Sequence, residues 1–280
     1  MQRVAVGQET LSVEIQGSGP PLLLVHGFPL DHTMWQHQIE ELADQFQVIA
    51  PDLRGFGASA LAEPHDLSDE PGPSGQAVSA ITMEQYADEL VGMLDALRID
   101  QLVAYCGLSM GGYIGWQFLI RHADRLGRLI MCDTKAVADS PQVKQVRMET
   151  AERVLQEGPG FLAEVMRDRL FSPTSLRDKP TAVEATQQVI RDTNPRAIAA
   201  ALYGMAERPD MRDRLPSIDV PSLLIGGELD VISPAEEMRG IAQSMPNAKF
   251  IPIPQAGHMA PLERPQEVNS AIREFLSDWV

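Results

Sequence analysis

Short, solid apolar runs recur along this chain, and segments with helical spacing separate them. The runs lie at residues 21–25, 46–50, 102–106 and 129–132. The helical segments between them lie at residues 34–45, 83–98 and 113–122. Strands that are apolar on both faces, instead of alternating, are typical of a parallel sheet that helices cover on both sides. The pattern therefore predicts an α/β fold with a mainly parallel sheet.

The strand pattern stops after the fourth run and returns only towards the C-terminus. Helical segments separated by prolines occupy residues 141–157, 159–171, 180–193 and 195–207. Strands then follow at residues 221–225 and 249–253, with helices at 234–245 and 264–278. These segments predict a core of residues 1–133 and 210–280 that is interrupted by a helical insertion, residues 134–209. Residues 60–80 are rich in proline, glycine, serine and acids, and we expect them to form a long surface loop.

One serine lies in the pattern Gly-x-Ser-x-Gly, which Gly107, Ser109 and Gly111 form. The pattern follows the strand expected at 102–106 and precedes a helix. A nucleophilic serine of this type needs a very sharp turn from strand to helix, which exposes its hydroxyl at the carboxyl edge of the sheet. The flanking glycines are expected to permit that turn. Ser109 is therefore predicted to be a nucleophile.

A serine hydroxyl is a weak nucleophile and needs a base, normally an imidazole that a carboxylate holds. His258 follows the last expected strand, where the chain returns to the carboxyl edge of the sheet. Asp230 follows the preceding strand and is the favoured acid, since it also lies between Ser109 and His258 in sequence. Asp133, at the end of the strand at 129–132, is its rival. His26 begins a glycine turn and is expected to serve local packing. The histidines in polar surroundings are expected to be solvated: His32, His37, His65 and His122.

Acyl transfer also needs hydrogen-bond donors for the oxyanion that develops on the substrate carbonyl. The backbone N–H of Met110, directly after the nucleophile, is one candidate. The backbone N–H of Phe28 is the other, because the turn at 26–29 leaves the strand at 21–25. Pro29 has no N–H and cannot take this role. A site of this kind requires no cofactor and no metal.

Together these motifs resemble the α/β-hydrolase superfamily over nearly the whole chain. The matching segments are residues 26–29, 52–57, 107–112, 226–230 and 257–258. The order of Ser109, Asp230 and His258 is also that family's order. The resemblance implies an α/β-hydrolase fold, with a mainly parallel eight-stranded sheet flanked by helices and a helical cap at 134–209. Within the superfamily, the chain is most similar to small bacterial carboxylesterases and 3-oxoadipate enol-lactonases.

The predicted function is a carboxylesterase-type serine hydrolase that cleaves esters of small to medium substrates through an acyl-enzyme intermediate. Side chains of the cap are expected to line an apolar substrate pocket: Phe161, Met166, Leu170, Phe171, Leu202, Tyr203 and Met205. Haloalkane dehalogenases and epoxide hydrolases of this fold carry an aspartate where Ser109 stands, so alkyl-enzyme chemistry is disfavoured. An enol-lactonase, a carbon–carbon bond hydrolase or a perhydrolase would use the same triad. The alternative of another class is a ligand-binding or signalling protein with slow turnover.

Charge restricts the partners of this chain. It has 23 basic and 39 acidic residues, a net charge of -16, and a pI near 4.7, so its field repels phosphate backbones and anionic lipids. We expect a small-molecule ester or lactone as substrate, and neither nucleic acid nor membrane insertion. Cys106 and Cys132 lie in apolar runs and are expected to be buried, reduced thiols. The N-terminus has no apolar stretch like that of a signal peptide, which indicates a cytoplasmic protein.

Overall fold

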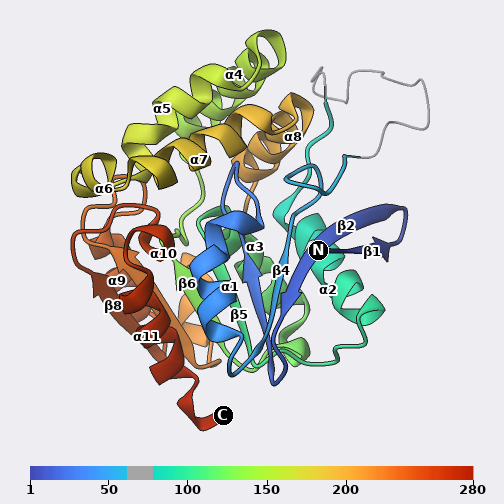
Figure 1. The fold of residues 1–280 in the computed structure, drawn as a ribbon, viewed down its shortest axis with the longest axis vertical. Helices are drawn as coiled ribbons and strands as arrows, with labels where there is room; N and C mark the ends of the chain where they lie inside the picture. Colours follow the sequence, from blue (N-terminus) through green and yellow to red (C-terminus); the bar gives the residue numbers. More distant parts are fainter. Residues whose placement is uncertain (62–77, 280) are drawn as a thin grey trace.

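A single mixed sheet forms the centre of the computed structural model, which describes residues 1–61 and 78–279 (Figure 1). Its strands are β1 Gln2–Val6, β2 Glu9–Gln16, β3 Pro21–Val25, β4 Gln47–Pro51, β5 Ala104–Leu108, β6 Leu129–Cys132, β7 Ser222–Gly227 and β8 Ala248–Ile253. The spatial order is β1-β2-β4-β3-β5-β6-β7-β8. The pairs β1–β2 and β2–β4 are antiparallel, and every pair from β4 to β8 is parallel. The predicted α/β class and the mainly parallel eight-stranded sheet are confirmed.

Helices cover both faces of the sheet. They are α1 Gln36–Leu42, α2 Met83–Ala96, α3 Met110–Arg121, α9 Ala235–Gln243, α10 Ala260–Glu263 and α11 Pro265–Phe275, with 3-10 turns at His32–Trp35, Ala123–Arg125, Arg212–Ser217 and Ser277–Trp279. Figure 1 shows α1 and α11 together on one face, and α2 and α3 on the other. Strands β3, β5 and β6 are therefore buried on both sides, which explains their solid apolar sequences.

A second group of helices lies between β6 and β7 in the sequence. These helices are α4 Pro141–Glu157, α5 Gly160–Leu170, α6 Pro173–Asp178, α7 Pro180–Asp192 and α8 Pro195–Ala206. Four of them have a proline in the first turn, where its fixed backbone angle suits a helix start. Figure 1 shows them, in yellow-green to orange, stacked over one end of the sheet. That end carries Ser109, because Ser109 lines a cavity together with side chains of α4, α5 and α8.

The elements differ from the sequence-based expectations in several places. Strand β1 and helix α6 were not predicted, since both are short and lack a clear apolar period. Strand β5 begins two residues later than expected, because Leu102 forms only an isolated bridge with Leu126. The single helix expected at 264–278 consists of α11 and a terminal 3-10 turn, and the short helix α10, which was not predicted, precedes it. Residues 62–77 of the surface loop expected at 60–80 lie outside the described residues.

Two buried cysteines lie side by side in the centre of the sheet. Cys106 on β5 and Cys132 on β6 are free thiols with their sulfur atoms 4.0 Å apart. This agrees with the expectation of buried, reduced cysteines. Among the described residues, no helix combines the length and the apolar character that a membrane crossing requires.

Candidate active site

Ser109 occupies the sharp turn between β5 and α3. Its backbone angles are φ 54° and ψ -109°, a region that L-residues with a side chain rarely adopt and that costs about 1–3 kcal/mol. Two hydrogen bonds hold the backbone of Ser109 in this turn. The N–H of Ser109 donates to the carbonyl of Cys132 at 3.0 Å. The carbonyl of Ser109 accepts from the hydroxyl of Thr134 at 2.7 Å. Such a restrained, strained serine is what the sequence pattern predicted.

The two glycines of the pattern are required by close packing, and not by their own backbone angles. A Cβ atom on Gly107 would lie 2.4 Å from the carbonyl oxygen of Gly111, across the turn. A Cβ atom on Gly111 would lie 2.3 Å from the carbonyl oxygen of Val25 on β3. Backbone atoms cannot move aside as a flexible side chain can. Only Ser109 itself has a positive φ within this pattern, so the glycines let the helix approach the strands closely.

His258 and Asp230 form a buried pair. His258 follows β8, Asp230 follows β7, and the Nδ1 atom of His258 lies 2.8 Å from Oδ2 of Asp230. Their side chains are 2% and 0% exposed. Burial by itself raises the pKa of Asp230, but the charge and hydrogen bond of His258, with backbone N–H groups such as that of Ile232, outweigh it and lower the pKa. Asp230 is therefore ionised and accepts from Nδ1 of His258, and in the neutral tautomer of this ring Nε2 is the acceptor.

Asp133 lies beside this pair but is not bonded to the imidazole. One of its carboxylate oxygens lies within 4.8 Å of a carboxylate oxygen of Asp230 and of a ring nitrogen of His258. Its Oδ1 accepts from the N–H of Gly227 at 2.7 Å, and its buried Oδ2 has no partner within the described part of the chain. Burial and then the charge of Asp230 raise the pKa of Asp133 well above its usual range. Burial and the neighbouring charge thus favour the neutral form of Asp133, and the hydrogen bond to His258 belongs to Asp230.

Two backbone donors remain available next to Ser109. Met110 is the first residue of α3, so its N–H has no partner inside that helix. Phe28 lies in the turn after β3 and lines the same cavity as Ser109. Neither N–H donates to another group among residues 1–61 and 78–279. Both N–H groups are therefore free to act as the oxyanion donors that the sequence predicts.

The cavity above Ser109 has a volume of about 430 Å³. Ser109, His258 and Phe28 form its floor, and side chains of α4, α5 and α8 form its walls. Four of the expected pocket residues line it: Phe161, Met166, Leu202 and Met205. The other three expected residues do not line it and are instead buried in the hydrophobic core: Leu170, Phe171 and Tyr203. A helix presents only one of its apolar faces to a cavity, and the sequence alone does not show which one.

Most of the remaining wall was not foreseen. It consists of Tyr113, Gln142, Val143, Val146, Arg147, Thr150, Leu162, Val165, Arg169 and Ile232. For α4 a signal existed, because Val143, Val146 and Thr150 follow helical spacing and share one face of that helix. The sequence gave no signal that Arg147 and Arg169 line the cavity, since charged residues on helices mostly face solvent.

His26 serves the local structure, as expected. Its Nδ1 lies 2.9 Å from the carbonyl oxygen of Gly27, and its Nε2 accepts from the N–H of Leu53 at 3.0 Å. The ring is completely buried, and burial lowers its pKa. His26 is therefore neutral and ties the turn that carries Phe28 to the segment after β4.

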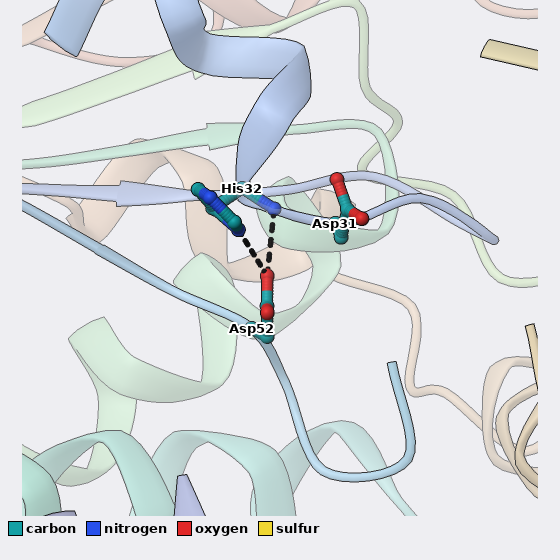
Figure 2. A group of neighbouring side chains, drawn as sticks. All are labelled: Asp31, His32 and Asp52. Atoms are coloured by element: carbon teal, nitrogen blue, oxygen red, sulfur yellow. Dashed lines mark hydrogen bonds and ion pairs between the residues drawn. The ribbon is translucent and has the colours of Figure 1, made fainter. Parts of the chain in front are cut away.

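A cluster of Asp31, His32 and Asp52 holds the loops near this turn (Figure 2). His32, which we expected to be solvated, is half-buried and donates from both its backbone N–H and its ring Nδ1 to Oδ1 of Asp52, at 2.9 and 2.7 Å. Burial lowers the pKa of His32, but the hydrogen bond and charge of Asp52 outweigh it, so that the pKa is raised. The second oxygen of Asp52 accepts from the N–H of Ala58, and Asp31 accepts from the N–H of Thr33. These carboxylates are occupied by the fold, so the cluster is a structural ion pair.

Comparison with known proteins places this geometry in a family. A sequence model described as alpha/beta hydrolase fold matches residues 20–265, which is most of the chain. The chain belongs to the alpha/beta hydrolase family. A thermophilic esterase from Thermogutta terrifontis, solved with malate bound, is 45% identical to this alpha/beta hydrolase, with a TM-score of 0.91 over 99% of both chains.

Two further relatives of this alpha/beta hydrolase are described as enol-lactonases. The 3-oxoadipate enol-lactonase 2 of Acinetobacter baylyi is 28% identical over 98% of this chain and 94% of its own length. The structure of the enol-lactonase from Burkholderia xenovorans LB400 is 28% identical, with a TM-score of 0.87, over 99% of this chain and all of that one. The family and these relatives support a hydrolase.

Proposed function

We propose that this alpha/beta hydrolase is a serine hydrolase of the carboxylesterase type, which cleaves esters of small to medium substrates through an acyl-enzyme intermediate. The observation that carries the proposal is that strained Ser109 and the buried His258–Asp230 pair open into one cavity. The resemblance to an esterase and to enol-lactonases supports it, because those reactions also cleave an acyl–oxygen bond.

In the proposed reaction, Nε2 of His258 takes the hydroxyl proton of Ser109 while Oγ attacks the substrate carbonyl carbon. The charge that develops on the carbonyl oxygen is stabilised by the N–H groups of Phe28 and Met110. Asp230 stabilises the imidazolium. His258 then gives its proton to the departing alcohol oxygen, and the acyl group stays on Ser109. Water, deprotonated by His258, releases the carboxylic acid and restores the serine.

Residues 134–209 are proposed to act as the cap of this site. Their helices supply the apolar walls through Phe161, Leu202 and Met205, which exclude water from the serine. A low local dielectric strengthens the interactions with the developing oxyanion. The cap, and not the sheet, would therefore set the size of the substrate.

A lactone is the second candidate substrate. It is favoured by the two enol-lactonase relatives, and its ring opening uses the same attack on an acyl–oxygen bond. The product alcohol would remain attached to the acyl group. A lactonase would thus need the same residues as an esterase.

Steady-state turnover tests the proposed function. We expect the protein to release many equivalents of p-nitrophenol from p-nitrophenyl acetate and butyrate, and fewer from the octanoate, because the cavity holds about 430 Å³. Parallel assays with an enol-lactone show whether cyclic esters are preferred. Release of a single equivalent per protein, followed by no further turnover, would instead indicate a ligand-binding protein that retains the triad.

A further inference from the structure

One buried carboxylate near the triad has no part in the proposed reaction. Glu263, at the end of α10, is 1% exposed, and no cation pairs with it within the described part of the chain. Both of its oxygens accept from backbone N–H groups, Oε1 from Gly257 at 2.7 Å and Oε2 from Ser172 at 2.8 Å. A buried charge without a counterion is costly unless hydrogen bonds satisfy it, so Glu263 depends on these two bonds.

The short helix α10 explains how Glu263 reaches the loop of the base. The helix begins two residues after His258, and the N–H groups of Leu262 and Glu263 both donate to the carbonyl of Met259 at 2.9 Å. This single turn returns the side chain of Glu263 to Gly257, which lies only six residues earlier in the chain. The carboxylate and the loop of the base therefore form one closed unit.

The two N–H groups that Glu263 accepts from belong to different parts of the molecule. Gly257 directly precedes the base, whereas Ser172 lies between α5 and α6 in the proposed cap. A further bond joins the same two segments, because the N–H of Met259 donates to the carbonyl of Leu170 at 3.1 Å. The residues on both sides of the base are therefore linked to the end of α5 and the turn after it.

The loop of the base also packs closely against these neighbours. A Cβ atom on Gly257 would lie 2.7 Å from the backbone nitrogen of Ser172, so a larger residue there would displace the backbone. The same loop is bonded to the loop of the triad acid, because the carbonyl of Ala256 accepts from the N–H of Leu229 at 2.8 Å. The loop of the base is thus attached both to the acid loop and to the cap, and Glu263 supplies two of the bonds on the cap side.

We propose that Glu263 is a positioning residue that bonds the loop of the base to the cap and thereby holds Nε2 of His258 within reach of the hydroxyl of Ser109. Asp230 sets the direction of the imidazole ring, and Glu263 sets the backbone that carries it. Proton transfer needs heavy atoms about 2.6–3.2 Å apart, and a displacement of about 1 Å slows a reaction about 10²-fold. The inference rests on the proposed function, because it concerns the base of the same reaction.

Glu263→Gln tests this role at nearly constant side-chain size. The amide keeps one acceptor oxygen but directs an N–H donor at the second backbone N–H, so one of the two bonds is lost. We expect kcat for p-nitrophenyl butyrate to fall by about 10- to 100-fold. We expect KM to change by less than about twofold, because Glu263, Gly257 and Ser172 do not line the cavity.

Lys179→Met is the matched control. The Nζ of Lys179 also bonds the cap to α10, since it donates to the carbonyl of Leu262 at 3.3 Å, but this bond does not involve the loop of the base. Its kcat should stay within about twofold of the wild-type value. Thermal unfolding of both variants shows whether each is folded at the assay temperature. An unchanged kcat in folded Glu263→Gln, or an equal loss in both variants, would overturn the positioning role and leave the esterase intact.

Glu263→Asp is the second variant, for the case that the amide does not fold. It keeps the negative charge, but its side chain is one methylene shorter and cannot reach both N–H groups. We expect a loss of kcat in the same direction, again with little change in KM. Full activity of Glu263→Asp would overturn the proposal.

A spectroscopic measurement separates this inference from the proposed function. The proton shared by Nδ1 of His258 and Asp230 gives a low-field signal in proton NMR, and its position depends on the geometry of that hydrogen bond. We expect this signal to shift or disappear in Glu263→Gln and to stay unchanged in Lys179→Met. That result would support the positioning of His258 even if no ester were hydrolysed. An identical signal in the wild type and both variants would contradict it.

Discussion

Replacement of Ser109 by alanine is expected to lower kcat/KM for p-nitrophenyl butyrate by about 10⁴-fold or more. The alanine has no oxygen to form the acyl-enzyme, so only the oxyanion donors and the binding of the substrate remain. The fold should persist, because the bonds that hold the turn involve the backbone of residue 109 and not its hydroxyl. Steady-state assays and thermal unfolding of the same preparations measure both quantities.

A surface serine provides the control for this substitution. Ser244, which follows α9, is exposed and bonds to the carbonyl of Gly240. Ser244→Ala should retain full activity. If Ser109→Ala kept more than about a tenth of the wild-type rate while remaining folded, the serine could not be the nucleophile.

Replacement of Asp230 by asparagine is expected to lower kcat by about 10³- to 10⁴-fold. The amide would donate to Nδ1 of His258 and drive the ring proton to Nε2, where the base must accept. Asp133→Asn is the matched variant, since it changes a neighbouring carboxyl group in the same way. Its loss should stay below about threefold, because Asp133 makes no hydrogen bond to the imidazole and the amide oxygen can still accept from the N–H of Gly227. Assays of kcat with p-nitrophenyl butyrate compare the two variants.

The ranking of these two variants decides the identity of the acid. A greater loss in Asp133→Asn than in Asp230→Asn would mean that the hydrogen bond seen between His258 and Asp230 is not the one used in the reaction. Equal, large losses in both would indicate that the two carboxyl groups act as one unit.

The sheet and the Ser109 turn were predictable from the sequence because each depends on local chemistry. A strand buried on both faces must be apolar throughout, as β3, β5 and β6 are. The positions of Asp230 and His258 also follow from topology, since parallel strands deliver the residues after them to one edge. In the structure these two side chains meet and form a hydrogen bond.

The cavity wall was only partly predictable because it depends on how helices pack. Leu170 and Phe171 are as apolar as Phe161 and Met166, yet the first two enter the core. The direction of each side chain is set by the contacts of α5 with its neighbours, which involve residues distant in sequence. The same holds for Arg169, whose position at the cavity has no local signature.

The most direct test of the serine mechanism is covalent labelling with an alkyl fluorophosphonate, followed by intact-mass measurement and peptide mapping. Phosphonylation replaces fluoride at phosphorus with the attacking oxygen and gives a stable adduct at an activated serine. We predict one adduct per chain, located at Ser109, with loss of activity in proportion to labelling. An adduct at a different residue that accounts for the lost activity, or continued hydrolysis by fully exposed protein that carries no adduct, would contradict the assignment of Ser109 as the nucleophile.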